Sequence, residues 1–100
     1  MKSLKLFGAN DIRLVETEKP QIGPDELLIK TGAAAVCGTD IRMWVNGKAG
    51  VDENHPLTLG HEFAGTIVEV GSNVPFYKEG MKVAMQPNIG CGICDRCVDG

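Results

Sequence analysis

A histidine and a glutamate stand side by side at the start of an apolar, glycine-punctuated segment, GHEFAGTIVEVGSNV, residues 60–74. The pattern predicts a buried strand, and a buried charged group needs a partner because leaving it unpaired is costly. On a regular strand His61 and Glu62 would point to opposite faces. Gly60 permits an irregular start, which would let both side chains turn toward one partner.

Short alternating segments and one helical segment fill most of the remaining chain. Ile41, Trp44 and Val45 recur at helical spacing after Cys37, and we predict one short helix that ends at Gly47. Thr39 or Asp40 could cap its start. The predicted strands span residues 3–7 and 12–18, which form a hairpin, and then 26–36 with an irregularity at Gly32, 62–71 and 81–86.

This pattern of many short strands with one short helix predicts a mainly β chain that forms a small, partly open β barrel. We expect residues 48–58 to form a polar loop. Residues 87–100 should form a loop held by its cysteines, in which Pro87 and the glycines argue against a helix. No predicted strand is followed by G-x-G-x-x-G and a helix, so the sequence contains no dinucleotide-binding unit.

Composition excludes several classes of function. The net charge of −3 argues against a nucleic-acid partner, which calls for a basic surface. No apolar run is long enough to span a membrane. The first residues contain no apolar secretory signal, which favours the cytoplasm. In that compartment the four cysteines indicate metal-binding or catalytic thiolates rather than disulfides.

Three cysteines, Cys91, Cys94 and Cys97, form a C-x-x-C-x-x-C run. Thiolate groups at this spacing are typical of structural zinc sites, whereas exposed thiols without a metal would be reactive liabilities. A tetrahedral site needs a fourth ligand. Either Asp95 or Asp99 supplies it, or the chain is a piece of something longer. An iron–sulfur cluster also fits this run, because bacterial ferredoxins begin with the same spacing.

Cys37, His61 and Glu62 carry a thiol, an imidazole and a carboxylate, all of which bind zinc. Three protein ligands leave one coordination position open, as in a catalytic zinc site. Other interpretations stay open at this point. Cys37 could be a small buried apolar residue, His61 a hydrogen-bonded polar residue, and Glu62 a group that contacts the ligands instead of the ion.

Together these motifs resemble the zinc-dependent medium-chain alcohol and polyol dehydrogenases, in particular the sorbitol- and threonine-dehydrogenase-like members. GHEFAGTIVEVG resembles the family's zinc signature, Cys37-Gly38-Thr39-Asp40 its first-ligand motif, and the three clustered cysteines its structural-zinc lobe. The resemblance covers residues 37–97. It implies a GroES-like β barrel that holds the zinc, and a Rossmann domain that binds NAD or NADP. Residues 1–100 match only the first, so we expect a GroES-like catalytic domain supplied without its cofactor domain, with the lobe's fourth cysteine beyond Gly100.

The resemblance also implies roles for individual residues. Thr39 would take the proton from the alcohol, and Asp40 would orient the imidazole ring of His61. Trp44 would form part of the pocket wall. The implied catalytic zinc ligands are Cys37, His61 and Glu62, with Glu62 either a third or an exchangeable ligand, and the implied structural zinc ligands are Cys91, Cys94 and Cys97.

The implied activity is the interconversion of an alcohol or polyol and its carbonyl compound. Zinc lowers the pKa of a bound hydroxyl group, and a hydride then passes to the nicotinamide. We expect the whole protein to be a homo-oligomer and the chain by itself to be inactive, with an exposed apolar face. Two alternatives belong to other classes of protein: a non-catalytic, zinc-stabilised GroES-like module, and an iron–sulfur carrier that uses the three clustered cysteines.

Arg42 departs from the family pattern. Many relatives have a histidine at this position, five residues after the first cysteine ligand, as the last link of a proton relay. Arginine stays protonated and is a poor general base. Either the proton leaves through water, or Arg42 contacts a phosphate or an anionic substrate, or it is simply an exposed helix residue. His55 has no counterpart in the pattern, and we expect it to be a loop residue.

Overall fold

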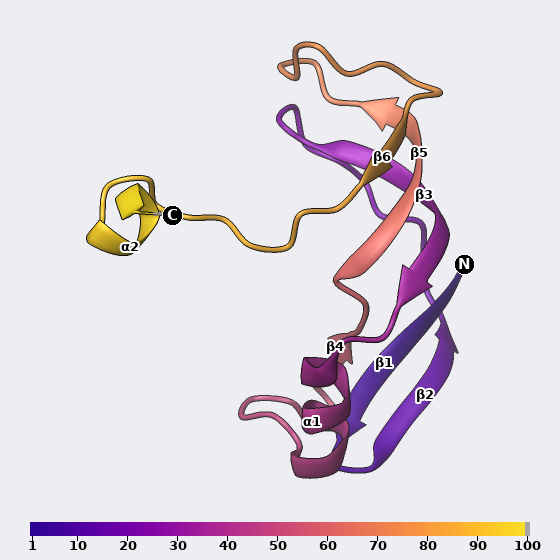
Figure 1. The fold of residues 1–100 in the computed structure, drawn as a ribbon. Helices are drawn as coiled ribbons and strands as arrows, with labels where there is room; N and C mark the ends of the chain where they lie inside the picture. The colour runs from indigo at the N-terminus through magenta and orange to yellow at the C-terminus, as the bar shows by residue number, and fades with distance from the viewer. Residues whose placement is uncertain (100) are drawn as a thin grey trace.

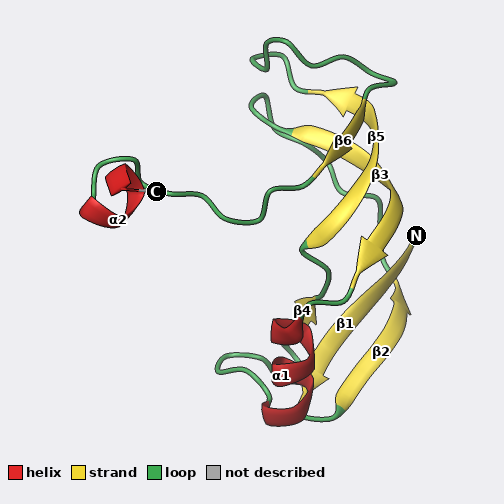
Figure 2. Ribbon diagram, in the orientation of Figure 1, coloured by secondary structure: helices red, strands yellow, loops and turns green. Residues whose placement is uncertain are grey.

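The computed structural model describes residues 1–99, which form two three-stranded antiparallel sheets and two short helices (Figures 1 and 2). The strand order is β2-β1-β4 in one sheet and β3-β5-β6 in the other. The elements are β1 (Lys2–Gly8), β2 (Asp11–Glu16), β3 (Leu27–Ala35), α1 (Gly38–Asn46), β4 (Leu57–Thr58), β5 (Glu62–Val70), β6 (Lys82–Ala84) and α2 (Asp95–Asp99).

The predicted N-terminal hairpin is confirmed by the pairing of β1 with β2. Asn10 lies in its turn with a φ of 59°, a left-handed conformation that asparagine tolerates better than most residues. The backbone N–H of Asn10 donates a hydrogen bond of 2.6 Å to the carbonyl oxygen of Trp44. This bond joins the hairpin turn to the last turn of α1.

The second sheet depends on the long antiparallel pairing of β3 with β5, from Leu27 opposite Val70 to Ala35 opposite Glu62. Its register shifts between Thr31 and Ala33, which confirms the predicted irregularity at Gly32. Gly65 lies so close to β3 that a Cβ atom there would overlap the carbonyl oxygen of Lys30.

Helix α1 begins differently from the prediction. Cys37 is its N-cap, not Thr39 or Asp40. Asp40 lies at the third helical position, and its Oδ2 accepts a hydrogen bond of 3.0 Å from the backbone N–H of Cys37. This is the return half of a capping box, which satisfies a donor at the helix start. The helix ends at Gly47 as predicted, where φ is 73°.

Two short elements were not expected. The cysteine-rich segment contains α2, so the argument against a helix there was wrong. Pro87, Gly90 and Gly92 all precede Ile93, and none of the residues from 94 to 99 is a proline or glycine that would prevent a helical turn. In that turn the N–H of Val98 donates to the carbonyl of Cys94. The segment expected to be a polar loop contains β4, because Leu57 and Thr58 pair with the edge of β1.

The expected mainly β, open architecture is confirmed, and much apolar surface is uncovered in the part of the chain that the structure describes. Leu6 and Ile67 are its only fully buried large side chains. The accessible surface is 7715 Å², whereas a compact chain of this mass would expose about 5,500 Å². Helix α2 stands away from both sheets at the end of an extended segment (Figure 1). None of the described helices is long and apolar enough to cross a membrane.

The close approach at Gly65 generates a stability prediction. We expect Gly65→Ala to lower the free energy of unfolding by about 3 kcal/mol, because the added methyl group would force β5 away from β3. Gly32→Ala is the matched control, because the nearest atom to a Cβ there is 3.7 Å away. Urea unfolding measures both, and equal unfolding midpoints for the two variants would contradict the close packing at Gly65.

Candidate metal centres

The structure brings together two groups of side chains that could each hold a metal ion. One consists of Cys37, His61 and Glu62, and the other of Cys91, Cys94 and Cys97. Within each group the ligand atoms all lie within 4.8 Å of one another. Both groups are the ones that the sequence predicts.

Strand pairing and one glycine assemble the first group. Ala35 at the end of β3 lies opposite Glu62 at the start of β5. The residues that follow β3 and the residues that precede β5 therefore also come close. Cys37 follows β3 and His61 precedes β5. Gly60 has a φ of 97°, a conformation that favours glycine, and it bends the chain just before His61. The predicted irregular start lets neighbouring residues meet at one point.

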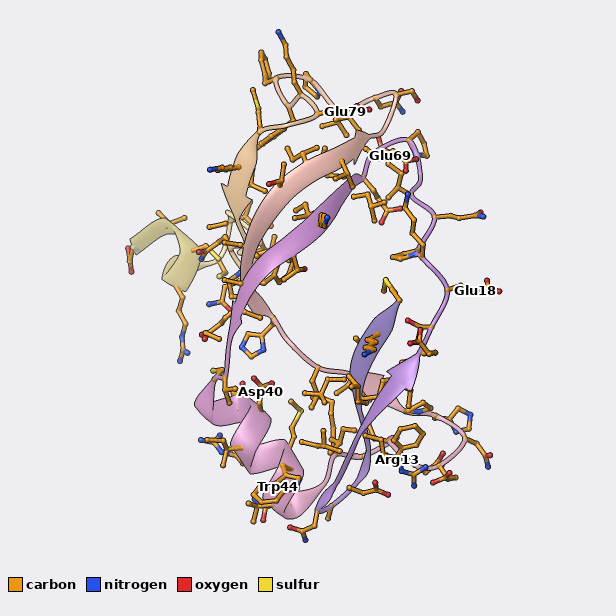
Figure 3. The ribbon with its side chains drawn as sticks, turned by 90° about the vertical axis from the view of Figure 1, so that its right-hand side faces the viewer. Arg13, Glu18, Asp40, Trp44, Glu69 and Glu79 are labelled. Carbon is orange, nitrogen blue, oxygen red and sulfur yellow. The ribbon has the colours of Figure 1, made fainter. Side chains whose placement is uncertain are left out.

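The buried carboxylate of Asp40 supports this group. Asp40 is 8% exposed, and its Oδ1 lies 3.7 Å from Nδ1 of His61 without a hydrogen-bond partner. That distance exceeds a hydrogen bond, so this buried oxygen is left unsatisfied. The arrangement fits metal binding, because a ligating histidine commonly donates its other ring N–H to a carboxylate. Figure 3 shows Asp40 in the first turn of α1.

The first group is open to solvent on one side. Cys37 and His61 are half-buried, whereas Glu62 and the nearby Thr39 are exposed. Three protein ligands with an accessible side are the arrangement that a catalytic zinc site requires, since substrate must reach the metal.

The second group is exposed and built from one short stretch of chain. The Sγ atoms of Cys91 and Cys97 are 3.6 Å apart, and the N–H of Cys94 donates to Sγ of Cys91 over 3.3 Å. Backbone N–H groups of Ile93 and Cys94 lower the pKa of Cys91 to about 6, because they stabilise the thiolate. All four cysteines are free thiols.

The fourth ligand of the second group is not supplied by either acidic residue that the sequence suggested. Asp95 and Asp99 do not belong to the group of ligand atoms. Within residues 1–99 the structure therefore assembles three ligands here, all of them thiols.

An apolar cavity of about 270 Å³, which the sequence does not predict, lies beside the first group. Asp40 and Gly60 are part of its wall, but Cys37, His61 and Glu62 are not. Trp44, expected in a pocket wall, does line this cavity. The lining residues come from distant segments, so no local pattern could reveal the cavity; they are Leu4, Ile12, Ala34, Ala35, Val36, Asp40, Ile41, Trp44, Leu59 and Gly60.

A second feature that the sequence did not predict is the ion cluster around Arg13 (Figure 3). Its guanidinium donates to both oxygens of Asp11 and both oxygens of Glu53 at 2.7–2.9 Å, and lies 4.1 Å from the Phe7 ring centroid. These bonds lower the pKa of both carboxyl groups. Since all three charged groups are exposed, the cluster ties the loop before β4 to the hairpin with modest energy. His55 lies in that loop, as expected, and contacts Asp52.

Comparison with known proteins places these features in context. Residues 23–100 match the sequence model of the alcohol dehydrogenase GroES-like domain. The L-threonine 3-dehydrogenase of Caldanaerobacter subterraneus subsp. tengcongensis is 46% identical over 98 residues, which are 97% of this chain and 28% of that protein. The sorbitol dehydrogenase of Bombyx mori is 40% identical over 96 residues, which are 95% of this chain and 28% of that protein.

Solved structures of dehydrogenases also resemble this chain. The galactitol-1-phosphate dehydrogenase of Escherichia coli superposes with a TM-score of 0.83 at 35% identity, over 100% of this chain and 28% of that one. The chain thus spans about 28% of the length of these relatives.

The two groups should bind metal independently, because they lie on separate parts of the chain. We expect two zinc ions per chain, of which Cys37→Ser removes one and Cys94→Ser the other. Metal content after dialysis, measured by plasma mass spectrometry, tests this. Loss of both ions from either single variant would show that the groups are one coupled unit.

Asp40 generates a separate prediction. Asp40→Asn keeps an oxygen that can accept the N–H of Cys37 but removes the negative charge beside His61. We expect zinc affinity at the first group to fall about 10- to 100-fold, with the second group unaffected. Competition with a chromophoric chelator measures it. Asp95→Asn is the matched control, and equal affinities of Asp40→Asn and the unaltered protein would exclude support of His61 by Asp40.

Proposed function

Because the chain belongs to the family of alcohol dehydrogenase GroES-like domains, we propose that it is the zinc-binding part of an oxidoreductase. The proposed reaction interconverts an alcohol or polyol and its carbonyl compound, with NAD or NADP as the hydride acceptor. The observation that carries this proposal is the convergence of Cys37, His61 and Glu62 within 4.8 Å, beside an unsatisfied buried carboxylate.

Zinc at this site would lower the pKa of an alcohol hydroxyl group and polarise a carbonyl group. Each nearby residue has a part that follows from its position. The Cys37 thiolate and the His61 imidazole would bind the ion, and the nearby Asp40 carboxylate would orient the imidazole ring. Glu62 is exposed, so its carboxylate can bind the ion or give way to substrate.

Thr39 is the residue that we assign to proton transfer. Its hydroxyl group can accept one proton while it donates another, as a relay requires. It lies two residues after Cys37 and is exposed, so a proton taken from the substrate hydroxyl can continue to solvent.

The relatives suggest the kind of alcohol. Their names refer to sorbitol, threonine and galactitol 1-phosphate. Each of these molecules carries a hydroxyl group on a carbon whose neighbour bears a second hydroxyl or an amino group. We therefore assign to this chain a substrate with two adjacent polar groups, one of which is oxidised.

Further parts of the proposal concern the whole protein. The chain spans about 28% of the length of these relatives, and we assign binding of the nicotinamide cofactor to the whole protein and not to residues 1–100. The group of Cys91, Cys94 and Cys97 is assigned a structural zinc ion. A cytoplasmic location and a homo-oligomeric state stay predictions.

The experiment is turnover by the intact, zinc-loaded protein with sorbitol or threonine, followed by the absorbance of the reduced nicotinamide. Thr39→Val should lower kcat about 100- to 10,000-fold because the proton loses its acceptor. Thr39→Ser keeps the hydroxyl group and should keep most of the activity, and both variants should keep their zinc.

Other outcomes would identify the alternatives. A colourless protein that holds zinc but turns over no alcohol would be a non-catalytic module. A brown protein that holds iron would be an electron carrier, and either result would refute the dehydrogenase assignment.

A further inference from the structure

Arg42 is a positive charge near the first metal-ligating group that the proposed reaction does not use. Helix α1 has two different sides. Asp40, Ile41 and Trp44 line the apolar cavity, whereas Thr39 and Arg42, which are exposed, do not. Residues three apart on a helix are neighbours on its surface, so Arg42 lies next to Thr39 on the side that faces away from the cavity.

No acidic side chain among residues 1–99 pairs with the guanidinium of Arg42. The positions three and four residues from Arg42 are occupied by Gly38, Thr39, Val45 and Asn46, none of which is acidic. Among residues 1–99 no ion pair or side-chain hydrogen bond includes Arg42, whereas Arg13 is bonded to two carboxylates. The donors of the Arg42 guanidinium are therefore available to an external anion, for which their forked geometry is suited.

Thr39 and Arg42 are one helical turn apart on α1, so their Cβ atoms are about 5–6 Å from each other. The Arg42 guanidinium lies at the end of a flexible side chain that extends well beyond its own Cβ atom. An anionic group several carbons away from the oxidised hydroxyl group, at the end of an extended substrate, is therefore within its reach.

We propose that Arg42 binds the phosphate of a substrate that is a polyol phosphate, with the oxidised hydroxyl group near Thr39 and the phosphate one helical turn further along α1. This inference rests on the proposed function and names its substrate class. A phosphate monoester carries more negative charge than a carboxylate and offers three oxygens to the guanidinium fork. Arg42 is then a residue that determines specificity.

The test compares sorbitol 6-phosphate with sorbitol in the intact, zinc-loaded protein. We expect a kcat/KM for the phosphate ester at least tenfold above that for sorbitol. Arg42→Gln should lower kcat/KM for the ester about 10- to 100-fold, mainly through KM, because a charge-assisted hydrogen bond is lost. Arg42→Lys keeps the charge without the fork and should fall between the two. Lys82→Gln, which removes an exposed charge from β6, is the control and should leave the preference intact.

Binding of sorbitol 6-phosphate, measured by calorimetry without cofactor, separates this inference from the proposed function. If neither compound is oxidised but Arg42→Gln still weakens binding of the ester at least tenfold, the dehydrogenase proposal fails and the role of Arg42 stands. Three results overturn that role. The first is an equal preference for the ester over sorbitol in Arg42→Gln and the unaltered protein, and the second is a preference of the unaltered protein for sorbitol or threonine over the ester. The third is an effect of Arg42→Gln that is confined to the KM of NAD or NADP.

Discussion

The arrangement of Cys37, His61 and Glu62 depends on two contacts of the buried Asp40 carboxylate. One oxygen accepts the backbone N–H of Cys37 and so defines the first turn of α1. The other faces the imidazole of His61 at 3.7 Å. A single side chain therefore sets where the helix starts and what surrounds the histidine. That second oxygen is buried beside the imidazole ring, where a carboxylate can orient a ligating histidine.

The two metal-ligating groups are built in different ways. The group of Cys37, His61 and Glu62 is assembled by pairing between strands that are far apart in sequence, with Gly60 as the bend that aligns them. The cysteine group is assembled by a spacing of two residues within one loop and a single helical turn. The first is thus sensitive to the register of β3 and β5, whereas the second depends only on its own local conformation. This difference suits the roles that we propose for them, a catalytic site that must be positioned against a substrate and a structural site that only has to hold an ion.

Much of the candidate site could be predicted from the sequence, because its chemistry lies in a few distinctive residues. All six proposed metal ligands are in the two groups that the structure assembles. The cavity beside Trp44 and the ion cluster of Arg13 with Glu53 could not be predicted. Both join segments that are tens of residues apart, and neither leaves a periodic pattern in the chain. The start of α1 was misplaced for a related reason: a cysteine at the N-cap offers little local signal, and Asp40 acts from inside the helix.

The sequence by itself determined the alternation that makes the strands, the glycine that ends α1, and the types and order of the candidate metal ligands. These follow from properties of short segments: period-two patterning, backbone freedom and ligand chemistry. Only the tertiary structure decided the register of β3 against β5, the pairing of β4 with β1, and the position of Asp40 beside His61. Those features depend on contacts between segments that are distant in sequence. Packing and hydrogen bonding across the whole fold determine these contacts, and no single segment specifies them.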